Sequence, residues 1–165
     1  MPDAAVVQET IDYVAITRLQ SAYGDAVNRR AWSEFARLFL PGAPVRVDTV
    51  TNPVIDVTGP SELGTFIARA IERFAFFEFV ILNTHVEIDG DTARGRVFMC
   101  ELRQEHDDTG GQWSNAFGVY HDDYVRRDAR WWFARRRYQS LARFSTAARA
   151  EVFPFPHDDA SGDDR

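Results

Sequence analysis

The step Asp89-Gly90 stands between two long stretches of alternating apolar and polar residues, and it constrains the chain more than any other feature. Glycine accepts a positive φ and aspartate tolerates a tight bend, so this pattern is typical of a β-hairpin. We therefore predict one long hairpin over residues 79–105, turning at Asp89-Gly90-Asp91. Such a hairpin belongs in the middle of a curved sheet, with one face that other elements must cover.

The chain before the hairpin can supply helices for that face. Apolar side chains recur every three to four positions in three stretches, which is the period of a helix facing a core. The predicted helices span residues 8–30, 32–39 and 61–75. Residues 1–7 carry no such pattern and are expected to form a loose start.

Further strands are predicted where apolar and polar residues alternate outside the hairpin. These stretches are residues 45–48, 54–57, 113–127 and 131–142. Asp107 to Gly111 is rich in aspartate and glycine and is expected to be the turn that follows the hairpin. The chain therefore reads as helices first and an antiparallel meander afterwards.

This order predicts an α+β fold. We expect a cone-shaped, strongly bent antiparallel sheet wrapped around the N-terminal helices, as a single domain over residues 8–142. Residues 143–165 are expected to be a partly disordered tail. The first helix cannot fill the wide end of such a cone, so a pocket is expected there, apolar with a few converging polar groups.

Composition excludes several classes of partner. The formal net charge of −6 argues against a nucleic-acid partner, which requires a basic face. The single cysteine, Cys100, excludes an internal disulfide and suits a reducing compartment. No apolar stretch is long enough to span a bilayer and the N-terminus does not resemble a signal peptide, so we expect a cytoplasmic protein without a membrane partner. No histidine or carboxylate cluster has a metal-ligand spacing, so no metal is expected. No other cofactor is expected either.

Three stretches carry a resemblance to a known family. They are AYGDAVNRRAWSEFARLF, NTHVEIDGDTARGRV and YHDDYVRRDARWWFARRR, in that order and spacing, with a proline-glycine stop after the first. Together they resemble the SnoaL-like branch of the nuclear transport factor 2-like superfamily over roughly residues 10–140. That superfamily includes scytalone dehydratase, ketosteroid isomerase, polyketide cyclases and members without catalysis, so the resemblance implies the cone fold and leaves the activity open.

The resemblance implies a catalytic pair that this chain has replaced. Many SnoaL-like members and dehydratase relatives carry an aspartate at the position of Asn28, which orients a histidine at the position of Phe79, four residues before Asn83. Neither an amide nor a phenyl ring exchanges protons near neutral pH. Dehydration by that pair is therefore expected to be lost, and Asn28, Phe79 and Asn83 become candidates for contacts with a bound molecule.

The resemblance to ketosteroid isomerase implies other roles. Tyr23 matches the helix tyrosine that donates a hydrogen bond to the enolate oxygen there, with Tyr120 or Asp122 as the expected counterpart of its partner. The isomerase base comes from the first strand, near Asp48. His85 is a second candidate base, if a bulge turns it inward, because imidazole titrates near neutral pH.

Each candidate also has a structural interpretation. Tyr23 fits a core tyrosine at a pocket edge, and Asn28 fits a residue that closes the C-terminal end of a helix. A single histidine in a strand, such as His85, is more often hydrogen-bonded structure than a catalyst. Asp122 among tyrosines could act as an acid, or could pair with an arginine of the run 135–137. Arg136 is the member of that run expected to face inward, where it pairs with Asp122 or holds an anion.

Two functions are therefore compatible with the sequence. The first is a cofactor-free lyase or isomerase acting on a hydrophobic or polycyclic substrate, with Tyr23, Asp48, His85 and Asp122 as catalytic candidates. The second is a non-catalytic binding or scaffold protein for a small hydrophobic ligand. Dehydratase relatives close their pockets with C-terminal aromatic residues, which implies this role for Phe153 and Phe155, unless they pack on a neighbouring subunit. Phe117 and Val119 on the outer sheet face predict a homodimer.

Overall fold

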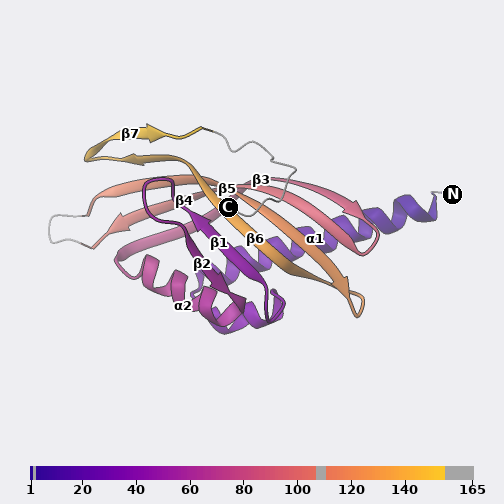
Figure 1. Ribbon diagram of the computed structural model, residues 1–165. Helices are drawn as coiled ribbons and strands as arrows, with labels where there is room; N and C mark the ends of the chain where they lie inside the picture. Colours follow the sequence, from indigo (N-terminus) through magenta and orange to yellow (C-terminus); the bar gives the residue numbers. More distant parts are fainter. Residues whose placement is uncertain (2, 107–110, 155–165) are drawn as a thin grey trace.

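The long hairpin is present in the structure, a computed structural model that describes residues 1, 3–106 and 111–154 (Figure 1). Strand β3 spans Phe74–Asp89 and β4 spans Thr92–Glu105, with Asp89 opposite Thr92 at the predicted turn. Gly90 has a φ of 57°, the left-handed conformation that the Asp-Gly step predicts. The predicted hairpin is confirmed, although β3 begins five residues earlier than the predicted Phe79. Its expected place in the middle of the sheet was wrong, because β3 is the last strand at one edge.

The first helix, α1, is longer than predicted and spans Ala4–Asn28. The Asp3 side chain accepts a hydrogen bond from the backbone N–H of Ala5 at 3.0 Å and caps the helix. The expectation of a loose start was therefore wrong for residues 4–7, where a capping aspartate outweighs the weak apolar pattern.

The next elements follow the predicted order. The 3-10 helix η1 covers Trp32–Arg37, strands β1 and β2 cover Pro44–Asp48 and Ile55–Thr58, and α2 covers Gly59–Ile71. Helix α2 starts at Gly59 with a φ of 77°, where an added Cβ would lie 2.3 Å from the Pro41 carbonyl oxygen. Helix α2 ends four residues before the predicted end at residue 75, because the aromatic run from Phe74 joins β3.

The remaining strands complete one sheet. Strands β5, β6 and β7 span Trp113–Arg127, Arg130–Ser145 and Ala148–Val152. The order along the sheet is β2-β1-β6-β5-β4-β3, and β7 also pairs with β6. All pairs are antiparallel except β1 with β6, which run parallel. The expectation of a tail from residue 143 was wrong as far as Val152, because β6 continues and turns back into β7; Phe155 and the residues after it lie outside the described residues.

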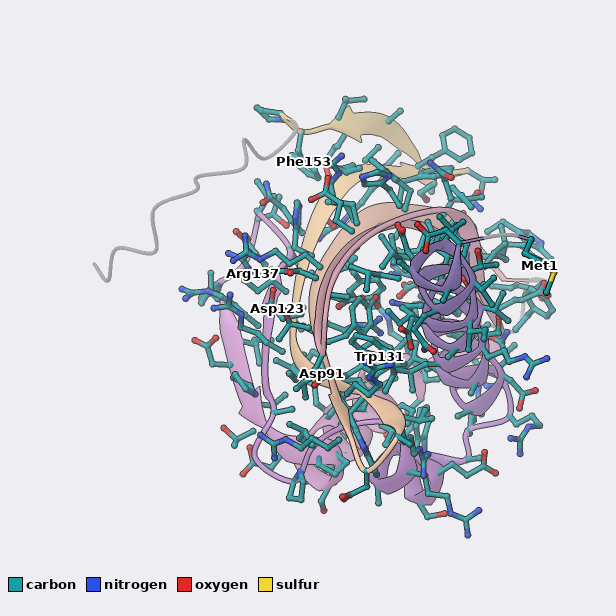
Figure 2. The ribbon with its side chains drawn as sticks, turned by 90° about the vertical axis from the view of Figure 1, so that its right-hand side faces the viewer. Met1, Asp91, Asp123, Trp131, Arg137 and Phe153 are labelled. Atoms are coloured by element: carbon teal, nitrogen blue, oxygen red, sulfur yellow. The ribbon has the colours of Figure 1, made fainter. Side chains whose placement is uncertain are left out.

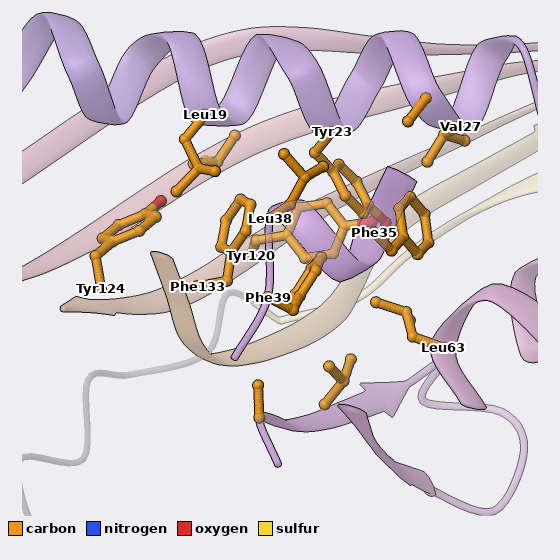
Figure 3. Packing of buried hydrophobic residues seen from close by; sticks show 14 of the residues in the cluster. Leu19, Tyr23, Val27, Phe35, Leu38, Phe39, Leu63, Tyr120, Tyr124 and Phe133 are labelled. Atoms are coloured by element: carbon orange, nitrogen blue, oxygen red, sulfur yellow. The ribbon is translucent and has the colours of Figure 1, made fainter. Parts of the chain in front are cut away.

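The sheet is strongly bent and α1 lies on its concave side (Figure 1). Viewed along the strands, the sheet forms an arc with Trp131 inside and with Asp123 and Arg137 outside (Figure 2). Tyr23 and Val27 of α1 pack towards Phe35 and Phe133 in the core between helix and sheet (Figure 3). The predicted α+β cone is confirmed. No helix among the described residues is long and apolar enough to cross a membrane.

Candidate functional site

A cavity of about 540 Å³ opens between α2 and the concave face of the sheet. This volume lies within the usual range of small-molecule pockets. Its apolar wall comes mainly from α2 and the start of β3, including Leu63, Phe66, Ile67, Phe74 and Phe77. Its polar wall comes from alternate residues of β4 and β6, which the pleat of each strand directs to the concave face.

Tyr23, Phe79 and Tyr120 come from three different elements and lie together in the cavity wall. The ring centres of Tyr23 and Phe79 are 5.5 Å apart at an interplanar angle of 86°, and those of Tyr23 and Tyr120 are 6.2 Å apart at 80°. Edge-to-face packing of this kind stabilises aromatic clusters. Helix α1 thus delivers one phenol and β5 delivers another to the same part of the cavity (Figure 3).

Both phenols are held in their protonated form. Burial raises the pKa of Tyr23, although the positive charge of Arg136 and side-chain hydrogen bonding with Tyr120 oppose the shift. Burial, followed by the influence of Tyr23, raises the pKa of Tyr120 well above its ordinary value. At neutral pH these groups therefore act as hydrogen-bond donors and not as bases.

A fully buried ion pair lies beside the phenols. The Arg136 Nε and Nη2 atoms donate to the two Asp122 carboxylate oxygens, each at 2.8 Å. The Gln20 amide donates to Asp122 at 2.7 Å and to the Tyr124 hydroxyl, which itself donates to Asp122 at 3.0 Å. These hydrogen bonds occupy Asp122, which does not line the cavity. Asp122 is therefore part of a structural ion pair, as one of its two interpretations predicted, and is not placed to act as an acid on a substrate.

Arg136 places a positive charge directly against the phenol rings. Its guanidinium carbon lies 4.1 Å from the ring centres of both Tyr23 and Tyr120, and Arg136 also lines the cavity. Burial lowers the pKa of Arg136, but the charge and hydrogen bonds of Asp122 reverse this, so the pKa is raised overall. The side chain therefore stays cationic, and its buried Nη1 atom has no hydrogen-bond partner.

A carboxylate also faces the cavity, at Glu101 on β4. Arg103, on the same face two residues later, donates to Glu101 through its Nε atom at 2.9 Å and through Nη2. Both side chains are about four-fifths buried. After burial itself, the charge of Glu101 is the largest influence that raises the pKa of Tyr138, a third phenol in the cavity wall.

Asn28 lies at the end of α1 and binds the backbone of β3. Its Nδ2 atom donates to the Phe79 carbonyl oxygen at 3.0 Å, and its Oδ1 atom accepts from the Phe79 N–H at 2.7 Å. The two residues that replace the implied catalytic pair are thus adjacent, as the resemblance implies. Phe79 lines the cavity, but Asn28 does not, and the amide serves to hold helix and strand together.

Most of the chain matches a known protein family. Residues 8–137 match the SnoaL-like domain. The chain belongs to the SnoaL-like domain family. Uncharacterized proteins of Mycobacterium tuberculosis (strain ATCC 25618 / H37Rv) and Mycobacterium bovis are each 27% identical to this SnoaL-like protein over 135 residues, covering 79% of this chain and 86% of theirs.

Solved structures share the fold of this SnoaL-like domain. The hexachlorocyclohexane dehydrochlorinase LinA-type3 from Novosphingobium barchaimii LL02 is 21% identical, with a TM-score of 0.74 over 90% of this chain and 99% of that one. A candidate scytalone dehydratase from Novosphingobium aromaticivorans is 18% identical, with a TM-score of 0.73 over 93% and 99%. An NTF2-like protein with a cystatin-like fold from the same species is 20% identical, with a TM-score of 0.68 over 84% and 87%. These structures share the fold, and the family match confirms the SnoaL-like assignment.

The remaining predicted residues of this SnoaL-like domain lie away from the cavity. A bulge in β3 leaves Leu82 without a partner between Ile81 and Asn83, and it directs Asn83 and His85 to the convex face. His85 is exposed there and contacts Glu87 at 3.2 Å. The bulge that was expected to turn His85 inward has the opposite effect.

Asp48 ends strand β1 and also lies outside the cavity lining. Its side chain accepts a hydrogen bond from the Val50 N–H at 2.7 Å, which closes a local turn. The expected base from the first strand therefore has a structural contact instead. Tyr23, Phe79, Tyr120 and Arg136 are the predicted site residues that the fold brings together at the cavity.

Glu101, Arg103 and Tyr138 also line the cavity, although they were not predicted from the sequence. The alternation of β4 could have indicated that Glu101 and Arg103 face the cavity, because they follow the buried Val97 and Met99 on the same face of the strand. On the convex face, Phe117 is 37% exposed as predicted, whereas Val119 is fully buried and does not contribute to an exposed apolar surface.

The described residues contain no group of three or more histidine, cysteine, aspartate and glutamate side chains that could hold a metal ion. Cys100 is buried, and burial raises the pKa of its thiol, as is typical of a structural cysteine. Phe153 lies beside Arg143, another residue of the cavity lining, with 5.8 Å from the guanidinium carbon to the ring centre.

Proposed function

We propose that this SnoaL-like protein is a cofactor-free isomerase or lyase that moves a proton next to a carbonyl group of a small hydrophobic substrate. The observation that carries the proposal is the pair of protonated phenols, Tyr23 and Tyr120, in a cavity with one apolar wall that also holds a carboxylate, Glu101. The names of the similar structures, a dehydratase and a dehydrochlorinase, agree with lyase chemistry.

In the proposed reaction the two phenols donate hydrogen bonds to the substrate carbonyl oxygen. Glu101 removes the proton from the adjacent carbon, and the electron pair of that C–H bond moves onto the oxygen to form an enolate. The phenols stabilise this negative charge, and the nearby guanidinium of Arg136 adds a favourable electrostatic field. Return of the proton to another carbon gives an isomer, whereas loss of a leaving group at the next carbon gives an alkene.

Deuterium uptake by a hydrophobic ketone tests this proposal without knowledge of the natural substrate. We expect the protein to accelerate exchange of the α-protons of 1-tetralone in D2O, followed by proton NMR. Tyr23→Phe and Glu101→Gln are each expected to lower this rate about a hundredfold, since one oxyanion donor or one general base typically contributes that much. Tyr13→Phe, at an exposed tyrosine of the same helix, should leave the rate unchanged. Equal rates in wild type and both site variants would refute the proposed chemistry.

A second candidate function is non-catalytic binding of a small hydrophobic molecule. It is favoured by the amide of Asn28 and the ring of Phe79 at the positions of the implied pair, and by the ion pair that Glu101 makes with Arg103. Recovery of an intact ligand after prolonged incubation, with the same affinity for wild type and Glu101→Gln, would support binding alone. Turnover of a tightly bound ligand would argue against it.

A further inference from the structure

Arg143 lines the same cavity from the last part of β6, and neutral acceptors hold its side chain. Its Nη1 atom donates to the Thr51 hydroxyl at 2.9 Å, and its Nη2 atom donates to the Thr49 carbonyl oxygen at 2.8 Å. A longer contact of 3.5 Å joins Nη2 to the Ser140 hydroxyl. Two loop residues and one strand residue therefore fix the direction of this partly buried guanidinium.

The other arginines of the cavity lining each have a carboxylate partner. Arg136 pairs with Asp122 at 2.8 Å, Arg103 pairs with Glu101, and Arg73 lies 3.8 Å from Glu105. In the part of the chain that the structure describes, no carboxylate lies at ion-pair distance from Arg143. This includes Glu151, which is opposite Arg143 in the β6–β7 pair.

The contacts of Arg143 orient its charge without neutralising it. A guanidinium has five N–H donors, and the contacts to Thr49, Thr51 and Ser140 use three of them. The remaining donors and the full positive charge suit a carboxylate, which forms short, charge-assisted hydrogen bonds with arginine. A partly buried position weakens the competition from water and salt for such a pair.

We propose that Arg143 binds the carboxylate of an amphipathic ligand whose apolar body fills the cavity. Tyr138 and Ser140, whose hydroxyl oxygens are 3.2 Å apart, continue the polar wall from the phenols towards Arg143. The Arg143 guanidinium reaches back along β6 to the Ser140 hydroxyl at 3.5 Å, so its charge lies at the end of this polar wall, beyond Tyr138 as seen from Tyr23 and Tyr120. The ligand class is thus a hydrophobic carboxylic acid. If the proposed function also holds, its reacting carbonyl lies beside Tyr23 and Tyr120.

Calorimetric titration with a matched pair of probes, dodecanoate and dodecanol, tests the anion site. We expect dodecanoate to bind the wild-type protein more tightly than dodecanol does. Arg143→Met should weaken dodecanoate binding about fivefold to tenfold, the loss expected for a charge-assisted pair in a partly buried site, with dodecanol unaffected. Arg143→Lys should restore part of the loss. Arg137→Met removes the same charge from the convex face of the same strand and should change neither affinity.

Three results would overturn the inference: no binding of dodecanoate to the wild type, an unchanged dodecanoate affinity in Arg143→Met, or an equal loss for both probes. Circular dichroism of Arg143→Met verifies that the fold is intact. These probes lack a ketone, so they report binding alone. The anion site can therefore be disproved even if ketone exchange is found to depend on Tyr23 and Glu101. Conversely, the anion site can hold when exchange is absent.

Discussion

Asp122 and Arg136 face each other across strands β5 and β6, and their side chains form a doubly hydrogen-bonded ion pair with almost no exposure to solvent. The pair stands beside the rings of Tyr23 and Tyr120, against which Arg136 packs at 4.1 Å. Two buried charges are costly unless both are satisfied, so this pair fixes the strands and the phenols relative to one another.

Removing one member of this pair should destabilise the protein strongly. Asp122→Ala leaves the Arg136 charge buried without a partner, and we expect a loss of about 3–5 kcal/mol in the free energy of unfolding. Urea unfolding followed by tryptophan fluorescence measures the change. The adjacent Asp123→Ala is the matched control, because Asp123 pairs with Arg135 on the outer face, where a loss below about 1 kcal/mol is expected. Similar losses in the two variants would contradict this account.

Asp12 should make stability depend on pH in the acid range. Its carboxylate accepts hydrogen bonds from Trp131 Nε1 at 2.8 Å and Arg126 Nη1 at 3.0 Å, which tie α1 to β6 and β5. Burial raises the pKa of Asp12, but these bonds, together with one from Gln8, outweigh it and lower the pKa below its ordinary value of 3.8.

Because the folded-state pKa is the lower one, the contribution of Asp12 is present above pH 3.8 and disappears as the pH falls through the folded-state value. Asp12→Asn should therefore cost about 1–2 kcal/mol at pH 7 and progressively less below pH 4. Urea titrations of wild type and variant across this range provide the test, and a constant difference down to pH 2 would refute it.

Gly118 is expected to tolerate no side chain, because Tyr138 occupies the space above it. A Cβ at Gly118 would lie 2.2 Å from the Tyr138 ring, whereas one at Gly42 would meet nothing within 4 Å. Gly118→Ala should cost about 1–3 kcal/mol by overpacking and should displace Tyr138 in the cavity wall. Thermal unfolding and dodecanol affinity measure both effects. Gly42→Ala is the control and should leave the cavity intact.

Asn28→Ala should lower the free energy of unfolding by about 1–2 kcal/mol, because it removes two hydrogen bonds between Asn28 and the backbone of Phe79 in β3. Hydrogen exchange of the Phe79 amide should accelerate in the same variant. Asn83→Ala, on the exposed face of the same strand, is expected to change neither quantity. An unaltered Phe79 amide in Asn28→Ala would show that the contact does not hold the strand.

The homodimer remains a prediction for solution experiments. On the convex face Leu82 is 57% exposed and Phe117 37% exposed, and apolar side chains gathered on one sheet face are commonly covered by a second copy. Sedimentation should give a dimer for the wild type and a shift towards monomer for Leu82→Lys combined with Phe117→Lys. A wild-type protein that sediments only as a monomer would exclude this interface.

Much of the fold could be predicted from the sequence, because local signals and the global pattern agree. The Asp89-Gly90 step fixed the hairpin, and the alternation of β5 placed Tyr120, Asp122 and Tyr124 on one face, where all three are buried. The parallel pairing of β1 with β6 had no local signal, because it joins strands some ninety residues apart in the chain.

The site was harder to predict, because its residues depend on details that alternation does not contain. One unpaired residue, Leu82, determines that Phe79 faces the cavity while His85 faces solvent. The direction of Asp122 was predicted, but its hydrogen bonds with Gln20 and Arg136 come from helix and sheet packing. Asp48 lies at the end of a short strand, where a local turn competes for its carboxylate.

The bulge at Leu82 has a consequence for how this strand can change over time. Because Leu82 is outside the pairing, the chain can lose that residue and keep every flanking side chain on its present side. We therefore expect single-residue deletions among relatives to accumulate at this point, where they leave the hollow of the cone unchanged. Elsewhere in β3 the same deletion would exchange the inner and outer surfaces of the strand.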